Sequence, residues 1–173
     1  MRIVAGEYKG RTLKSPAWDG LRPTSDRLRE TLFDILGESV RGVRVLDGYA
    51  GTGAIGIEAL SRGAAHVTFV DNDRRARNLI EANLAPLTPR RDAIIRSGFA
   101  GLDGAGFDLI VLDPPYSPDA ADSALDAVRD IVTPGTRVVV EHGARYAPPA
   151  ERNGLRLRRT VKAGDSALSF YDF

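Results

Sequence analysis

The tetrapeptide Asp113-Pro-Pro-Tyr116 combines residue types that suit chemistry on the exocyclic amino group of a base. Because prolines lack an N–H donor, this segment offers the Asp113 carboxylate and the Pro114 carbonyl as hydrogen-bond acceptors. Two acceptors that hold the hydrogens of an aniline-like NH2 would localise its lone pair toward an electrophilic methyl group. Tyr116 could stack on a base flipped out of its helix. Taken alone, the motif could also be a proline turn with a capping Asp and a surface Tyr.

A glycine-rich segment, Asp47-Gly-Tyr-Ala-Gly-Thr-Gly-Ala-Ile-Gly56, follows an apolar run and precedes a helical pattern. Gly51, Gly53 and Gly56 satisfy the G-x-G-x-x-G spacing, which lets a ligand lie against bare backbone at a helix N-terminus. Asp71 ends the next apolar run, where its carboxylate could accept hydrogen bonds from ribose hydroxyls. A dinucleotide and S-adenosylmethionine fit these features about equally.

Asp47 favours S-adenosylmethionine, because a carboxylate beside the loop would repel a pyrophosphate but could pair with the ammonium of a methionine moiety. The alternative is that the glycines only permit close packing of helix on strand and that Asp47 caps the following helix.

The elements that must position these motifs alternate between strand and helix. Short apolar runs, typical of a parallel sheet buried on both faces, predict strands at 43–47, 66–71, 93–97, 107–113 and 135–141. Helical patterns occupy 54–62, 74–84 and 119–132, and an earlier helix with apolar residues at 28–36 is expected to be capped by Thr24 or Ser25 and stopped by Gly37.

The two ends of the chain depart from this alternation. Residues 155–161 and 167–173 flank the turn dipeptide Gly164-Asp165 and predict an antiparallel hairpin at the sheet edge, and residues 1–14 predict a small N-terminal β-hairpin. We therefore expect a doubly wound, Rossmann-like α/β sheet with an antiparallel C-terminal edge hairpin and an N-terminal β-hairpin extension. Both motifs fall at the carboxyl ends of its strands, where such folds bind ligands.

Composition excludes several classes of function. The 173 residues include no Cys and two His, which rules out thiol nucleophiles, zinc knuckles and iron–sulfur clusters, and no metal is expected. No apolar run approaches the ~20 residues that a bilayer requires, so we expect a cytoplasmic protein without a membrane partner. The formal net charge of +1 is unevenly distributed along the chain. Residues 1–44 contain three more bases than acids and residues 151–173 contain two more, whereas residues 45–150 are acidic.

Together, the two motifs resemble those of class I methyltransferases that methylate amino groups. The segments Met1–Leu13, Arg22–Thr24, Arg29–Phe33 and Gly56–Ala64 further resemble the bacterial RsmD family of 16S rRNA guanine-N2 methyltransferases, over nearly the whole chain. The resemblance implies transfer of a methyl group from S-adenosylmethionine to N2 of one guanine near the P-site. It also implies a fully or nearly assembled small ribosomal subunit as substrate, and we expect the enzyme to be a monomer.

The resemblance assigns roles to residues of this chain. The catalytic set that would hold the guanine is Asp113, Pro114 and Tyr116. The set that would bind the cofactor is Asp47, Tyr49, Gly51 and Gly53 at its methionine end, Asp71 and Asn72 at its ribose, and Gly98 and Phe99 near its adenine. Two departures stand out: Gly48-Tyr49 replaces two bulkier apolar residues, and 96–99 lacks the acid that often contacts the adenine amino group.

Residues 1–24 are predicted to form an RNA-docking extension of the methyltransferase domain, 25–173. We expect salt-sensitive contacts with RNA phosphates from the basic residues of this extension and of the start of the first helix. These residues are Arg2, Lys9, Arg11, Lys14, Arg22, Arg27 and Arg29. The basic residues of 156–162 are better explained as protection of an edge strand.

Three other functions remain open from the sequence. An adenine-N6 or cytosine-N4 DNA methyltransferase would use the same tetrapeptide, although the chain is short for the target-recognition domain that such enzymes commonly carry. An NAD(P)-dependent reductase would use the same glycine loop. A non-catalytic RNA-binding assembly factor would need neither motif intact.

Overall fold

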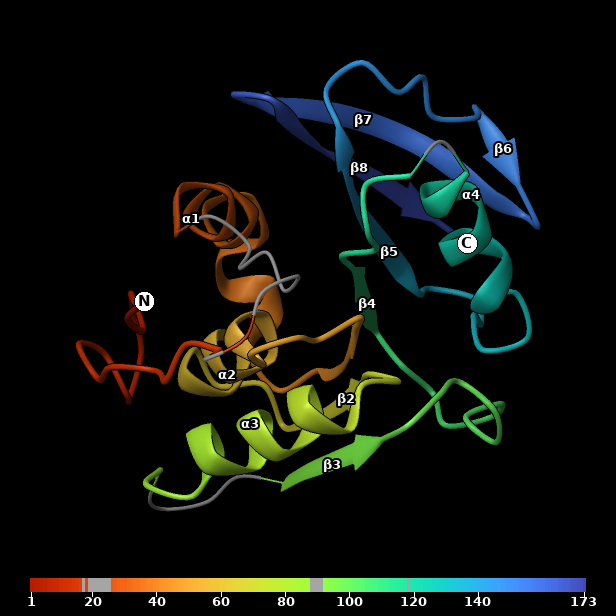
Figure 1. Ribbon diagram of the computed structural model, residues 1–173. Helices are drawn as coiled ribbons and strands as arrows, with labels where there is room; N and C mark the ends of the chain where they lie inside the picture. Colours follow the sequence, from red (N-terminus) through yellow and green to blue (C-terminus); the bar gives the residue numbers. More distant parts are fainter. Residues whose placement is uncertain (17, 19–25, 88–91, 118) are drawn as a thin grey trace.

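Eight strands form one mixed sheet in the order β3-β2-β1-β4-β5-β8-β7-β6 (Figure 1). The computed structural model describes residues 1–16, 18, 26–87, 92–117 and 119–173. Five strands are parallel: β1 (Arg44–Gly48), β2 (His66–Val70), β3 (Asp92–Arg96), β4 (Leu109–Leu112) and β5 (Arg137–Gly143). Three follow in antiparallel pairing: β6 (Glu151–Arg152), β7 (Leu155–Ala163) and β8 (Ser166–Asp172). The predicted doubly wound sheet and its C-terminal edge hairpin are thus confirmed.

Helices cover both faces of this sheet. They are α1 (Asp26–Leu36), α2 (Ala54–Ser61), α3 (Arg74–Leu84) and α4 (Ala120–Ala127), with a 3-10 turn, η1 (Gly37–Val40), after α1. Figure 1 shows α1 and α2 on one side of β4 and β5, and α4 on the other. The predicted end of α1 before Gly37 is confirmed, whereas its predicted caps, Thr24 and Ser25, lie outside the described residues. The predicted helix 119–132 ends earlier, at Ala127, where hydrogen bonds to the third residue back replace the helical pattern.

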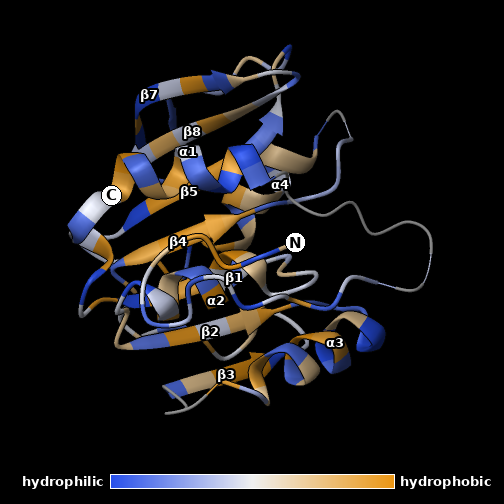
Figure 2. Cartoon of the chain, turned by 90° about the vertical axis from the view of Figure 1, so that its left-hand side faces the viewer, coloured by the Kyte–Doolittle hydropathy of each residue, from blue (hydrophilic) through white to orange (hydrophobic). Residues whose placement is uncertain are grey.

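Alternation along the central strands produces two apolar cores. Val45 and Val111 belong to the cluster that includes residues of α1, α2 and α3, whereas Leu46 and Ile110 belong to the cluster with α4. The central strands are therefore buried almost along their whole length, and β4, which consists only of apolar residues, is hydrophobic in colour throughout in Figure 2. Both motifs lie at the ends of these strands, the glycine loop after β1 and the Asp113-Pro-Pro-Tyr116 segment after β4.

Residues 1–14 fold back on themselves without forming regular strands. A single antiparallel bridge joins Arg2 and Thr12, and the Leu13 N–H donates to the Met1 carbonyl at 3.1 Å. Ile3, Tyr8 and Leu13 are buried in the cluster that contains α1 and α2. The predicted hairpin is therefore reduced to one bridge, and the segment is packed into the core.

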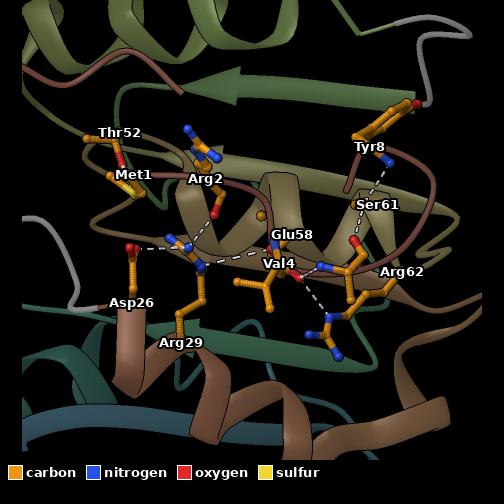
Figure 3. Close-up of polar contacts among 12 residues, drawn as sticks. Met1, Arg2, Val4, Tyr8, Asp26, Arg29, Thr52, Glu58, Ser61 and Arg62 are labelled. Atoms are coloured by element: carbon orange, nitrogen blue, oxygen red, sulfur yellow. Dashed lines mark hydrogen bonds and ion pairs between the residues drawn. The ribbon is translucent and has the colours of Figure 1, made fainter. Parts of the chain in front are cut away.

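The segment is held by two buried side chains of α2 (Figure 3). The Glu58 carboxylate accepts the N–H groups of Val4 at 2.8 Å and Ala5 at 2.9 Å. A side chain of α2 thus takes the place of the neighbouring strand as their hydrogen-bond partner. Ser61 accepts the Tyr8 N–H at 2.9 Å and donates to the Ala5 carbonyl at 2.5 Å. Glu58 also receives Arg62 Nε at 2.9 Å. The N-terminal segment and the helix that follows the glycine loop are thus one structural unit.

We expect Glu58→Ala to destabilise the protein strongly, because Glu58 is 1% exposed and its loss leaves two partly buried N–H groups and the buried Arg29 cation without their partner. The free energy of unfolding, measured by urea denaturation, should fall by about 3 kcal/mol. Glu38→Ala is the matched control: Glu38 also pairs with an arginine, Arg41, but its side chain is 88% exposed, so little change is expected. Equal effects of the two substitutions would contradict the role given to Glu58.

Candidate active site

The glycine loop between β1 and α2 makes a sharp turn in which the backbone of its glycines is not covered by side chains of its own. Tyr49, Gly51 and Gly53 all have left-handed φ angles, 61°, 55° and 77°, and α2 begins at Ala54. Asp71, at the end of β2, accepts the Gly51 N–H at 2.8 Å with one oxygen and the Asp73 N–H at 2.8 Å with the other. Asp71 therefore orders the loop while retaining lone pairs that could accept further hydrogen bonds.

Asp47 lies beneath this loop and is fully buried. Its Oδ2 accepts the Gly56 N–H at 2.8 Å, so Asp47 does cap the start of α2, as the alternative interpretation held. Gly56 itself is required by packing, since a Cβ there would come within 2.3 Å of the Phe69 ring. Capping and ligand binding are compatible, because a carboxylate can accept several hydrogen bonds.

Three carboxylates lie along this edge of the sheet on adjacent strands: Asp47 on β1, Asp71 after β2 and Asp113 after β4. Burial raises the pKa of Asp47 well above its usual range, although the Gly56 hydrogen bond opposes the shift, and repulsion from Asp113 and Asp71 adds to it. The site thus has a negative electrostatic potential that favours a cationic ligand.

Leu112 and Phe99 account for the unusual Gly48. A Cβ at Gly48 would come within 2.6 Å of Leu112 Cδ2 and 3.0 Å of the Phe99 ring, so these two side chains occupy the volume that a larger residue would fill. The rings of Phe99 and Tyr49 lie 5.7 Å apart. Nothing lies within 4 Å of a Cβ built on Gly98, which leaves its backbone approachable. Asn72 is exposed at the turn that precedes α3.

The Asp113-Pro-Pro-Tyr116 segment leaves β4 beside the glycine loop. The Asp113 N–H donates to the Gly48 carbonyl at 3.2 Å, which ties the two motifs together. Pro114 is buried and Asp113 is half-buried, whereas Tyr116 is 44% exposed. The structure therefore brings the predicted catalytic residues to the same edge as Asp47 and Asp71.

Tyr116 is held by residues that sequence reasoning missed. Its hydroxyl donates to Glu141 Oε1 at 2.6 Å and lies 2.5 Å from Ser166 Oγ. Burial and the neighbouring Glu141 carboxylate raise the pKa of Tyr116 to about 12, so the phenol stays protonated. Glu141 ends the predicted strand 135–141 at the same carboxyl edge as the three aspartates. This position could have identified Glu141 as a candidate site residue from the sequence.

A pocket of about 760 Å³ opens beside Tyr116. Its walls come from the segment after β4, the start of α4 and the residues that end β5 and follow it. Besides Tyr116, its polar side chains include Glu141, His142, Arg145 and Tyr146. It is large enough to admit a nucleotide.

The predicted RNA-docking residues have different environments. Arg2, Lys9, Lys14 and Arg27 are exposed, and Arg11 is exposed although its Nη1 donates to the Pro86 carbonyl at 2.6 Å. Arg22 lies outside the described residues.

The prediction for Arg29 is wrong, because its side chain is 1% exposed. Its guanidinium donates to the Arg2 carbonyl at 2.6 Å and to Asp26 at 3.0 Å, and lies 3.9 Å from Glu58 (Figure 3). It therefore stabilises the packing of the N-terminal segment.

Within the described residues, no group of three or more acidic, His or Cys side chains could hold a metal ion. No helix among them is long and apolar enough to cross a membrane.

The sheet, with its order reversing between β1 and β4, the glycine loop and the antiparallel β8 next to β5 together define a class I methyltransferase fold. The family described as "Conserved hypothetical protein 95" matches residues 1–172. Ribosomal RNA small subunit methyltransferase D of Escherichia coli (strain K12) is 32% identical over 99% of this chain and 89% of its own. YlbH of Bacillus subtilis (strain 168) is 34% identical over 99% and 98%. The solved structure of yhhF from Escherichia coli superimposes with a TM-score of 0.82 at 32% identity, covering 99% of this chain and 97% of that one.

The chain therefore belongs to the ribosomal RNA small subunit methyltransferase D (RsmD) family. The family predicted from the two motifs and the N-terminal segments is confirmed.

Substituting Asp47 should reveal the energetic cost of its buried charge. When folding raises the pKa of a carboxyl, that group's contribution to stability is complete below the ordinary pKa and is lost as the pH rises through the raised value. Asp47→Asn keeps an acceptor for the Gly56 N–H but buries no charge. We therefore expect the variant to be more stable than the parent protein at about pH 8, with a gain that shrinks as the pH falls toward 3.8, the ordinary value.

Urea unfolding across this pH range measures the difference. Asp130→Asn is the control, because Asp130 is an exposed partner of Arg129, and its replacement should produce no comparable pH dependence. If the Asp47→Asn protein is less stable than the parent at about pH 8, burial of the Asp47 charge does not destabilise the fold.

Proposed function

We propose that this protein transfers a methyl group from S-adenosylmethionine to the exocyclic N2 of a guanine in 16S rRNA near the P-site. Its substrate would be the small ribosomal subunit or a late assembly intermediate, and it would act as a cytoplasmic monomer. The observation that carries the proposal is the Asp113 N–H to Gly48 carbonyl contact at 3.2 Å, because it places the amino-group motif against the glycine loop. Membership in the RsmD family supports small-subunit rRNA as the substrate class.

The residues around the glycine loop fit this cofactor. When bound, S-adenosylmethionine supplies an electrophilic methyl group on a sulfonium. Asp47 and its neighbouring carboxylates would favour the cationic methionine end, which the backbone of Gly51 and Gly53 and the Tyr49 side chain would line. Asp71 and Asn72 would hold the ribose, and Phe99 with the backbone of Gly98 would lie near the adenine.

The segment after β4 would bind and activate the guanine. The Asp113 carboxylate and the Pro114 carbonyl would accept the two N2 hydrogens and turn the nitrogen lone pair toward the methyl group. When the methyl group passes from sulfur to nitrogen, N2 would lose one proton, and Asp113 would accept it. Tyr116, a residue that is 44% exposed, would stack on the flipped base.

The exposed bases of the N-terminal segment would provide phosphate contacts. Lys9 and Lys14 extend from a segment whose backbone is fixed to α2, and Asn83 accepts the Lys14 N–H at 2.8 Å while donating to the Thr52 carbonyl of the glycine loop at 3.0 Å. RNA held there would have a defined position relative to the cofactor loop.

Asp113→Ala should lower the rate of methyl transfer by about a hundred- to a thousandfold, because one of the two acceptors and the proton acceptor are lost. The assay incubates the variant with labelled S-adenosylmethionine and small subunits, naked 16S rRNA or DNA, and then identifies the methylated nucleoside by mass spectrometry. N2-methylguanine from small subunits is the expected product of the parent protein.

Cofactor affinity, measured by calorimetry, should change little in Asp113→Ala, whereas Asp47→Asn should weaken it at least about tenfold through loss of an ion pair with the methionine ammonium. Asp130→Asn is again the control. Full activity of Asp113→Ala would overturn the mechanism, and methylated DNA bases would identify a DNA methyltransferase instead.

Lys9→Ala/Lys14→Ala should weaken binding to small subunits and reduce the salt dependence of that binding by about one unit of slope per lost phosphate contact. Point substitutions are preferable to deletion of residues 1–14, because this segment forms part of the core. Lys162→Ala, an exposed base on β7, is the matched control. If Lys162→Ala weakens binding more than the double variant does, RNA docks on the C-terminal hairpin.

A further inference from the structure

We infer that Glu141 and Ser166 are positioning residues that hold the Tyr116 ring in place to stack on the target base. The inference rests on the proposed function, in which Tyr116 is the stacking residue. Neither residue needs to touch the substrate, since each acts through the Tyr116 hydroxyl.

The ring needs support because of its location. Tyr116 lies on an irregular segment between β4 and α4, with its side chain 44% exposed beside a pocket of about 760 Å³. An exposed tyrosine on such a segment ordinarily samples several rotamers, and binding would then have to immobilise it. A ring that is already fixed avoids this entropic cost.

The two partners of the hydroxyl are rigid. Glu141 lies on β5 and Ser166 on β8, and both side chains are buried. These strands pair antiparallel, with Glu141 opposite Leu168 and Gly143 opposite Ser166, so both partners belong to one continuous ladder. The phenol is therefore fastened to the sheet itself.

The hydrogen-bond donors can be assigned. A phenol has one proton, and in the structure it is directed to Glu141 Oε1 at 2.6 Å. The Ser166 hydroxyl, 2.5 Å away, must then donate to the phenol oxygen. Both bonds are satisfied only while Tyr116 keeps its proton, which agrees with its pKa of about 12. The bond to the carboxylate is the stronger one, because it is charge-assisted.

The experiment is a double-mutant cycle on methyl transfer to small subunits. Tyr116→Phe removes the hydroxyl but keeps the ring, and Glu141→Ala removes its acceptor. Each should lower kcat/KM for the RNA substrate about tenfold, the effect of losing one charge-assisted hydrogen bond, with the affinity for S-adenosylmethionine unchanged. Because both variants break the same bond, combining them should cost about tenfold in total and not a hundredfold.

Further variants separate positioning from general damage. Glu141→Gln retains an oxygen acceptor and should keep most of the activity. Ser166→Ala should have a smaller effect than Glu141→Ala. Tyr171→Phe is the matched control, since it removes another tyrosine hydroxyl, bonded at 3.2 Å to the Pro149 carbonyl outside the site. Thermal unfolding checks each fold, and if Glu141→Ala fails to fold, the cycle is run with Ser166→Ala, which removes the other partner of the Tyr116 hydroxyl.

Tyr116→Ala tests the stacking role of the ring separately from the support of that ring by Glu141. If it costs far more than Tyr116→Phe, and the cycle is non-additive, stacking and positioning both stand. If Tyr116→Ala is severe while Tyr116→Phe and Glu141→Ala are harmless, the ring matters but its support does not, and the inference is overturned. Additive losses would indicate that Glu141 contacts the RNA directly, which also overturns it. An active Tyr116→Ala would refute the stacking role in the proposed function.

Discussion

The buried Glu58 carboxylate is the contact on which the active edge of the sheet depends. It joins the N-terminal segment, through Val4 and Ala5, to α2 and to Arg29 of α1. Because α2 begins immediately after the glycine loop, the position of that loop follows from the position of this helix. A buried carboxylate with several donors is costly to disturb, so the arrangement is rigid where a ligand must find bare backbone.

The carboxyl end of β1 shows how function opposes stability. Asp47, Asp71 and Asp113 lie along one edge of the sheet, and the pKa of Asp47 is raised because its charge is buried there. In the unliganded protein, Asp47 caps α2 and Asp71 orders the glycine loop, but the charges of the cluster repel one another. A cationic ligand would relieve the repulsion, so the energy stored in folding would become part of the binding energy.

The fold was predictable from the sequence because its signals are local. Runs such as Leu109–Leu112 and turns such as Gly164-Asp165 identify the strands and the edge hairpin without knowledge of their partners. Arg29 was misassigned because a charged residue at the start of a helix reads as exposed, and its burial depends on a segment 27 positions earlier. The Tyr116 hydroxyl finds Ser166 50 positions away, which no local pattern reveals. The tertiary contacts of polar side chains therefore could not be predicted from the sequence.

The N-terminal segment resembles a separable docking arm in sequence but not in structure. Its apolar residues Ile3, Tyr8 and Leu13 are in the core, so its basic residues extend from a rigid base. Asn83 then connects the backbone of Lys14 to Thr52 in the glycine loop through two hydrogen bonds, at 2.8 and 3.0 Å. A phosphate bound by this segment would therefore have a fixed position relative to α2 and the glycine loop. If this segment docks RNA as proposed, the core itself would align the two substrates, without a hinge that binding would have to order.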